Sequence, residues 1–384
     1  MNPASSLGER GTVASSATVP DAPASTSVEP TQPDPESPNP MRRVGLRGLL
    51  VYAVTIAVTV VFSYLALRDV DFATVGHALA HSNYWWLVPA LAAFGLATFA
   101  RALRWHALFA PERRPALRAV GNAMLVGYLF NNILPARAGE AARVVTLRQR
   151  AGTGAAEVVG TVVVERLFDL LSILLIFFAA QPWLPHVSWF HTAAVAAIVL
   201  AVGLAATIVV LVVFGDRPVR FLARPLGRLP LLSAERVEHW AGDLVAGLSG
   251  LHRPTIAFFG FFWSLGAWLL SSLSAWLVTY AFGLHLGFDA GILCSVAVGL
   301  AMVLPAPPAS VGVFEAAALL ALNAYGISHT RALPYALVLH IVNFVPFVVF
   351  GAIALHFNAL HARRQSRASP APAPPLQGPS AIRH

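Results

Sequence analysis

The chain contains no lysine and few charged residues of any kind. Charged side chains make up 11% of its 384 residues, whereas soluble domains contain about 25%. All 26 basic residues are arginine, and the mean hydropathy is +0.67. A soluble globular protein is therefore not expected, and the composition predicts an integral membrane protein.

Motifs for metal binding and for hydrolysis are also missing from the sequence. The single cysteine, Cys294, excludes an intrachain disulfide and makes a thiolate metal site improbable. His77 and His81 are spaced like metal ligands but have no third ligand nearby, so we expect a solvated pair. The sequence contains neither HExxH nor GxSxG. We expect no metal, no cofactor, no catalytic residue and no nucleic-acid partner.

Long uncharged runs are what the sequence has instead. Twenty residues run from Gly48 to Leu67, twenty-four from Thr192 to Gly215 and thirty-five from Pro254 to Phe288. About 20 residues of helix cross the hydrocarbon core of a bilayer. These runs predict an all-α membrane protein.

Both ends of the chain differ from this middle part. Residues 1–40 contain eight prolines and no aromatic residue, which is typical of disorder. We predict a disordered tail over residues 1–44, a membrane domain over 45–358 with halves at about 45–182 and 188–358, and a disordered basic tail over 359–384.

The arginines predict the topology. They cluster before the first span, after the second, between residues 217 and 253, and after the last span. By the positive-inside rule these segments are cytoplasmic. We expect a multi-pass protein of the bacterial inner (cytoplasmic) membrane with both termini in the cytoplasm.

Two apolar segments do not fit as single crossings. Residues 119–142 have arginines on both sides, and residues 289–328 must also return to the side on which they start. Each breaks at a proline-containing stretch, LPARAGE at Leu134 and LPAPPASVGVFE at Leu304. We predict six full spans, near 48–67, 84–109, 156–180, 192–214, 254–283 and 333–357, plus two re-entrant hairpins in an inverted repeat, as in transporters. The alternative is eight full spans with proline kinks.

Charged residues inside these membrane segments are the candidate site. Such residues cost about 2.5–3.5 kcal/mol each at a helix centre and usually face a partner or a wet cavity. Arg101 and Arg104 share one face of the second span, where snorkelling to the interface is the alternative for Arg104. In the first hairpin, Asn131, Asn132, Arg137 and Arg143 lie around the break and are expected to cradle a lipid phosphate, which an arginine binds with two parallel hydrogen bonds.

Acidic residues at matching depth are the expected ion-pair or coupling groups. Glu157, Glu165 and Asp169 recur on one face of the third span with Arg166 beside them, and Glu140 and Glu315 follow the two hairpin breaks. Glu165 lies roughly 15 Å deep. It is expected either to form a buried ion pair with Arg137 or Arg101, or to exchange a proton during transport.

Four segments, RALRW, NNILPARAGEAARVV, VVVERLFDLLSI and LPAPPASVGVFEAAALLAL, resemble those of the lysylphosphatidylglycerol synthase transmembrane family. The resemblance covers about residues 45–358. It implies a lipid-handling, flippase-like membrane domain with re-entrant helices. It does not imply aminoacyl transfer, because the chain has no counterpart of the large soluble synthase domain.

Three kinds of function are compatible with the sequence. The favoured one is a non-enzymatic flippase or scramblase for an anionic phospholipid or an isoprenoid-phosphate lipid. The others are an accessory subunit of a lipid-modifying enzyme, which would then be a partner, and a membrane lipid transferase.

Overall fold

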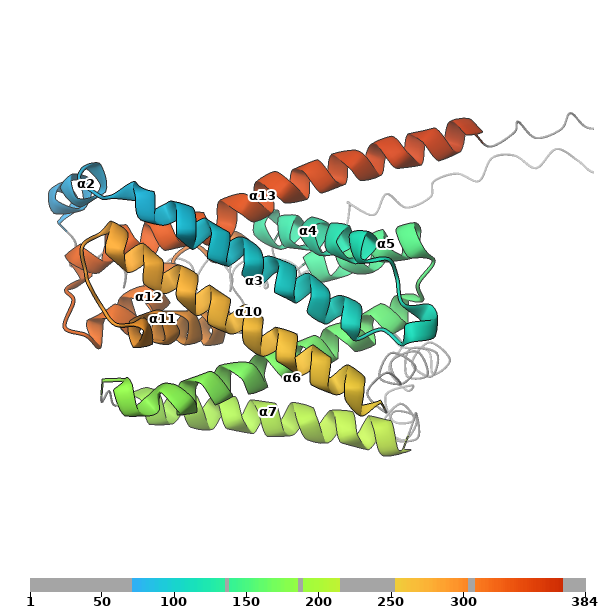
Figure 1. The fold of residues 1–384 in the computed structure, drawn as a ribbon, viewed down its shortest axis with the longest axis horizontal. Helices are drawn as coiled ribbons and strands as arrows, with labels where there is room; N and C mark the ends of the chain where they lie inside the picture. The colour runs from blue at the N-terminus through green and yellow to red at the C-terminus, as the bar shows by residue number, and fades with distance from the viewer. Residues whose placement is uncertain (1–70, 135–137, 186–188, 215–252, 303–307, 369–384) are drawn as a thin grey trace, which may run out of the picture. The chain divides into compact units, whose positions relative to one another are not determined.

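Helices and short 3-10 turns make up the described part of the chain (Figure 1). A computed structural model describes residues 71–134, 138–185, 189–214, 253–302 and 308–368, which belong to one compact unit beginning at Leu46. The first predicted span, residues 48–67, and the predicted tail 1–44 lie outside these residues. The main helices are α2 (Phe72–Ala80), α3 (Leu87–Ala107), α4 (Leu117–Ile133), α5 (Gly139–Ala151), α6 (Ala155–Ala180), α7 (Trp189–Phe214), α10 (Pro254–Ala281), α11 (Phe288–Ala301), α12 (Val313–Asn323) and α13 (His329–Ala368).

Three described segments are long and apolar enough to cross a membrane. They are Tyr84–Ala107, Pro254–Ala281 and His329–Leu360, and at most 33% of the residues in their most apolar windows are buried. Large apolar side chains such as Trp85, Phe258 and Phe350 are instead exposed. An apolar outer surface is the arrangement that a lipid environment favours.

α3 and α10 pack side by side along their whole length in opposite directions (Figure 1). Asn83 N donates to Ala281 O at 2.9 Å near one end, and Arg253 pairs with Glu112 at 2.8 Å near the other. The buried face of α3 carries alanines at positions 90, 93, 97 and 100, and α10 presents serines and alanines to it. Small side chains allow the two backbones to approach closely.

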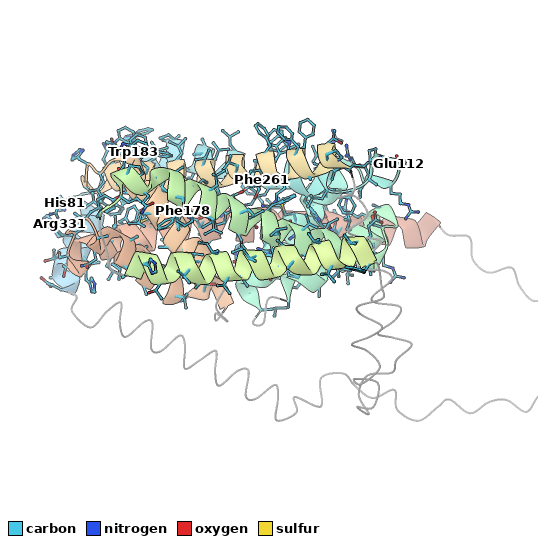
Figure 2. The ribbon with its side chains drawn as sticks, turned by 90° about the horizontal axis from the view of Figure 1, so that it is seen from below. His81, Glu112, Phe178, Trp183, Phe261 and Arg331 are labelled. Atoms are coloured by element: carbon cyan, nitrogen blue, oxygen red, sulfur yellow. The ribbon has the colours of Figure 1, made fainter. Side chains whose placement is uncertain are left out.

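The two ends of the bundle are marked by labelled residues in Figure 2, where His81, Trp183 and Arg331 lie at one end and Glu112 at the other. We call these the His81 end and the Glu112 end. α3 and α13 start at the His81 end, whereas α6 and α10 start at the Glu112 end. The relative sidedness of these helices therefore agrees with the prediction from the arginines.

The first hairpin consists of α4 and α5, which begin and end at the Glu112 end and pack against each other. Two glycines make the close packing possible. A Cβ on Gly139 would lie 1.9 Å from Gly127 O, and one on Gly127 would lie 2.2 Å from Arg143 Cγ. Asn131 Oδ1 accepts a 2.9 Å hydrogen bond from Gly139 N, so a side chain of α4 satisfies the first amide of α5.

The second hairpin consists of α11 and α12, joined through the short 3-10 turn η6 (Pro308–Ser310). It begins and ends at the His81 end, because it connects α10 to α13. Its arms are 14 and 11 residues long, well short of a full crossing. The break predicted at Leu304 falls mostly on residues 303–307, which lie outside the described residues.

The two hairpins cover different parts of α13. α4 lies along its later part, where Tyr128 stacks on Phe347 at 4.2 Å and Asn122 Nδ2 donates to Ala354 O. η6 and α12 lie along its earlier part, where both contact His340. η6 also packs against α4, so the hairpins meet inside the bundle.

The described helices differ from the predicted segments in two places. α2, a short helix capped by Asp71, occupies what is expected to be an outer loop; the Thr74 hydroxyl and the Ala73 N–H lower the pKa of the Asp71 carboxyl. α13 continues to Ala368, into the segment 359–384 that is expected to be disordered. Its last residues are mostly good helix formers, and the next proline after them is Pro370.

We predict that Gly139→Ala destabilises the first hairpin. The added methyl group meets backbone, which cannot rotate away, so we expect a loss of at least about 1–3 kcal/mol in unfolding free energy. Gly121→Ala in α4 is the matched control, because a Cβ there has no neighbour within 4 Å. Thermal melting of the purified proteins measures both. Equal melting temperatures for the two variants would contradict the close packing described above.

Candidate functional site

A cluster of six charged side chains joins three helices inside the bundle. The cluster, called the charge cluster below, contains equal numbers of basic and acidic groups and has a formal net charge of zero. Its members are Arg104 of α3, Glu140 and Arg143 of α5, and Glu165, Arg166 and Asp169 of α6.

Glu165 is the centre of the charge cluster. Its two carboxylate oxygens accept hydrogen bonds from Arg143 Nη1 at 3.1 Å and Arg143 Nη2 at 2.9 Å, in the two-pronged geometry typical of arginine. Arg104 Nη2 lies 3.1 Å from the same carboxylate. Arg104 and Arg143 are 1% exposed and Glu165 is 2% exposed. One buried carboxylate thus neutralises guanidinium groups from two other helices.

Asp169 connects the charge cluster to α10. It accepts a short hydrogen bond from Arg104 Nη1, one of 2.9 Å from Trp268 Nε1 and one of 3.3 Å from the Ser264 hydroxyl. Arg104 Nη1 also donates to Ser264 Oγ at 3.0 Å. α3, α5, α6 and α10 are therefore linked through three carboxylates and their donors.

Trp105 forms part of the wall around Arg143. The guanidinium carbon lies 4.0 Å from the centre of the Trp105 ring, a distance at which the face of the ring attracts a cation. Trp105 Nε1 donates to Thr161 Oγ1 at 3.0 Å, which holds the ring in place. The buried charge of Arg143 is thus compensated by an ion pair on one side and an aromatic face on the other.

One edge of the charge cluster is accessible. Arg166 is 44% exposed and Glu140 is 29% exposed, and they pair at 2.8 Å. Glu140 also lies 3.3 Å from Arg143 Nη1. At this edge a charged ligand can compete for a guanidinium without reaching the buried centre.

Arg101 lies one turn away from Arg104 on α3 and has no carboxylate partner among the described residues. Its Nη2 donates to Ser271 Oγ at 2.8 Å, its guanidinium carbon lies 5.9 Å from the Trp268 ring centre, and its Nη1 is buried without a hydrogen-bond partner. Arg101 therefore adds one uncompensated positive charge beside the charge cluster.

Three arginines in this region hold unsatisfied donors. Nε of Arg104, Nε of Arg143 and Nη1 of Arg101 are buried, and none has an acceptor within the described part of the chain. An unsatisfied buried donor costs about 1–3 kcal/mol or more when the group is charged. Each of these nitrogens could donate to an oxygen of an anionic group.

The remaining predicted site residues lie in different places. Asn131 satisfies the start of α5, Asn132 is half-buried with its amide nitrogen unpaired, and Glu157 has no ion-pair partner among the described residues. Glu315 lies in the second hairpin, apart from the charge cluster, and contacts His340. Arg137 lies outside the described residues.

Two expectations for these residues need correction. Arg104 does not snorkel to the interface, because its guanidinium points into the bundle and is 1% exposed. Glu165 pairs with Arg143 and Arg104, not with Arg101, because Arg101 lies level with Ser271 on α10. Partners that sequence reasoning did not identify are Trp105, Ser264, Trp268, Ser271 and His340. Of these, Trp105 belongs to the RALRW segment, which the sequence already marks.

Two grooves flank the charge cluster along α10. One, of about 330 Å³, lies toward the Glu112 end and is lined by residues that include His106, Arg114 and Trp263. The other, of about 610 Å³, is almost wholly apolar and is lined by residues that include Leu175, Leu265 and Leu269. Ser264 and Trp268, which form hydrogen bonds to the charge cluster, lie on α10 next to the lining residues Trp263, Leu265 and Leu269. Apolar space thus adjoins the polar centre toward both ends.

Comparison with known proteins supplies a family match over most of this structure. The family described as the lysylphosphatidylglycerol synthase TM region matches residues 51–351, which include the charge cluster and both hairpins. The chain is also similar to a UPF0104 membrane protein of Methanocaldococcus jannaschii, with 23% identity over 227 residues that cover 59% of this chain and 93% of that protein.

We predict that Glu165→Gln lowers the unfolding free energy by about 3–5 kcal/mol, because it leaves buried guanidinium groups without their carboxylate. Adding Arg143→Met should restore much of that loss, since Arg104 keeps Asp169. Glu157→Gln, on the same helix but without an ion-pair partner, is the control. Thermal and denaturant unfolding of the purified variants measures the effect, and an unaltered Glu165→Gln protein would mean that the ion pairs do not stabilise the bundle.

Proposed function

Because the chain belongs to the family of the lysylphosphatidylglycerol synthase TM region, we propose that it is a non-enzymatic translocase for an anionic membrane lipid, either a phospholipid or an isoprenoid-phosphate lipid. The observation that carries this proposal is the set of unsatisfied guanidinium donors on Arg101, Arg104 and Arg143. Their positive charge and geometry suit the oxygens of a phosphate headgroup.

Arg101 is the residue that we assign to first contact with the headgroup. Its charge has no carboxylate to displace, so binding does not require the ion pairs at Glu165 to break. Arg166, at the accessible edge, can exchange Glu140 for a phosphate oxygen at little cost, because exposed ion pairs are worth only about 0–1 kcal/mol. The headgroup can then be passed between guanidinium groups.

The two grooves along α10 support the proposal that a lipid moves through the protein and does not only bind to it. The groove at the Glu112 end has Arg114 and His106 in its lining, whereas the other groove is apolar apart from Asp289. A lipid can place its chains in such space while its headgroup stays with the arginines. The Glu112 end carries Arg113, Arg114, Arg118, Arg148 and Arg150, so we assign it to the cytoplasm, with both termini on that side.

Liposomes that contain the purified protein and a fluorescent lipid test the proposal. Dithionite added outside destroys the label only in the outer leaflet, so translocation appears as additional loss of fluorescence. We expect translocation of labelled phosphatidylglycerol or of a labelled isoprenyl phosphate, and little translocation of labelled phosphatidylcholine. If no anionic lipid moves, an accessory role beside a lipid-modifying enzyme is favoured; if a lipid is chemically altered, the protein is a transferase.

We predict that Arg101→Gln slows this translocation by about 10- to 100-fold, which corresponds to the loss of one charge-assisted hydrogen bond of about 1.5–3 kcal/mol. Arg101→Lys should stay impaired, because an ammonium cannot form two parallel hydrogen bonds. Arg118→Gln, which removes an exposed arginine of α4, is the control. Full activity of the Arg101→Lys protein would reduce Arg101 to a general positive charge.

We also predict that each hairpin is re-entrant, with two inverted halves and six full spans. In a background with Cys294→Ala, single cysteines at Ala116 and Arg150 should be labelled only from the cytoplasm by an impermeant maleimide. Cysteines at Gln181 and Ser328 should be labelled only from outside. A cysteine at Leu134, near the tip of the first hairpin, should not be labelled from outside; if it is, the eight-span alternative is correct.

A further inference from the structure

His340 and Glu315 form a second polar site, in the second hairpin and away from the charge cluster. His340 Nδ1 lies 2.5 Å from Glu315 Oε1, and His340 Nε2 lies 2.9 Å from the backbone oxygen of Ala309. The side chains of His340 and Glu315 are 12% and 9% exposed. The imidazole thus bridges α12 and η6 from its position on α13.

The two contacts of the imidazole show how many hydrogens His340 and Glu315 carry between them. The oxygen of Ala309 has no hydrogen to offer, so the contact with His340 Nε2 requires a hydrogen on that nitrogen. The short contact between His340 Nδ1 and Glu315 requires another, whichever of the two atoms holds it. The pair therefore carries both hydrogens and is electrically neutral, either as imidazolium with carboxylate or as imidazole with carboxylic acid. Removal of one proton would leave a single negative charge.

Aromatic rings surround the imidazole of His340. Phe314 stacks on the imidazole at 4.5 Å between ring centres, and Phe344 approaches it at 5.9 Å. No second charged group contacts the pair within the described residues. The titratable groups on the elements packed around the pair have other partners. Tyr325, after α12, donates to Asp289 of α11, and Tyr335 of α13 donates to Ala275 O of α10. Cys294 of α11 lies near Ala318 O, Tyr128 of α4 packs against Phe347, and Arg101 of α3 donates to Ser271.

The pair holds a strained piece of backbone. Ala309 and Ser310 both have φ of 58°, in the left-handed region that residues with a side chain rarely occupy, and Gly312 has φ of 83°. Glu315 Oε2 accepts from Gly312 N at 2.7 Å, and His340 Nε2 donates to Ala309 O at 2.9 Å. Loss of the hydrogen on His340 Nε2 would set two lone pairs against each other and release this segment. Since η6 packs on α4, the change would reach the hairpin that carries Arg143.

We propose that the His340–Glu315 pair binds and releases the proton that is coupled to lipid movement, an inference that rests on the function proposed above. Release of one proton frees Ala309 of η6 from His340, and rebinding restores the hydrogen bond from His340 Nε2 to Ala309 O. The second hairpin then has two arrangements, one with the proton bound and one with it released. A difference in pH across the membrane changes how often each arrangement is occupied.

Proteoliposomes with a pH gradient test the coupling. One pH unit corresponds to about a tenfold shift, per coupled proton, in the equilibrium ratio of labelled anionic lipid between the leaflets. We expect such a shift for the wild-type protein and for the control His356→Gln, which alters an exposed histidine of the same helix. We expect no shift for His340→Gln or Glu315→Gln. A wild-type protein whose lipid distribution ignores the gradient would overturn the inference.

Nitrogen NMR of the ¹⁵N-histidine-labelled wild-type protein provides a readout that does not depend on transport. The His340 signal, assigned by its loss in His340→Gln, should show hydrogen on Nε2 and a strong hydrogen bond at Nδ1. An ordinary Nδ1–H tautomer with a bare Nε2 would overturn the proton site. If the expected signal is present but no lipid moves under any gradient, the proton site is supported and the proposed translocation fails.

Discussion

The carboxylate of Glu165 is the contact on which the interior of this protein depends. It lies in a helix that must sit among apolar chains, and it neutralises guanidinium groups delivered by α3 and α5. A buried ion pair is not in itself a strong source of stability, because desolvation offsets most of the attraction. Its effect here is to specify geometry: α3, α5 and α6 can associate only in the register that brings these charges together. Asp169 and its donors extend the same constraint to α10.

The second constraint is that both hairpins share α13. α4 lies against one part of this helix, and η6 and α12 lie against another. The hairpins meet where η6 contacts α4, and each contains a buried charged group: Arg143 in the first and Glu315 in the second. The packing of one hairpin therefore depends on the position of the other.

Much of the fold could be predicted because its signals are strong. The segments expected at 156–180 and 254–283 are found as α6, Ala155–Ala180, and α10, Pro254–Ala281, since charges and prolines mark the ends of apolar runs clearly. The stretches in which the sequence places the hairpin breaks, at Pro135 and after Leu304, lie largely outside the described residues. The extent of α13 was not predicted, because good helix formers can continue a helix beyond the membrane segment.

Which residues form ion pairs with each other was harder to predict than which residues belong to the site. Spacing along a helix shows that Arg101 and Arg104 share a face, but it does not show how far α3 is shifted along α6, so the sequence does not tell which of the two pairs with Glu165. Arg137, the other expected partner, lies outside the described residues. Ser264, Trp268 and His340 are single polar or aromatic residues within apolar runs. They produce no periodic pattern, and only the packed structure shows that they contact charged groups.

The charge pairing also has a consequence for biogenesis. α5 contains Glu140, Arg143, Arg148 and Arg150 within 13 residues, so it cannot enter a bilayer alone at an acceptable free energy. Its neutralising carboxylate arrives with α6, which starts only a few residues later in the chain. The insertion machinery must therefore hold α5 at the channel or the interface until α6 has been synthesised, and release the two together. Because α6 follows α5 so closely in the chain, the cationic helix and the carboxylate that neutralises it are synthesised one directly after the other.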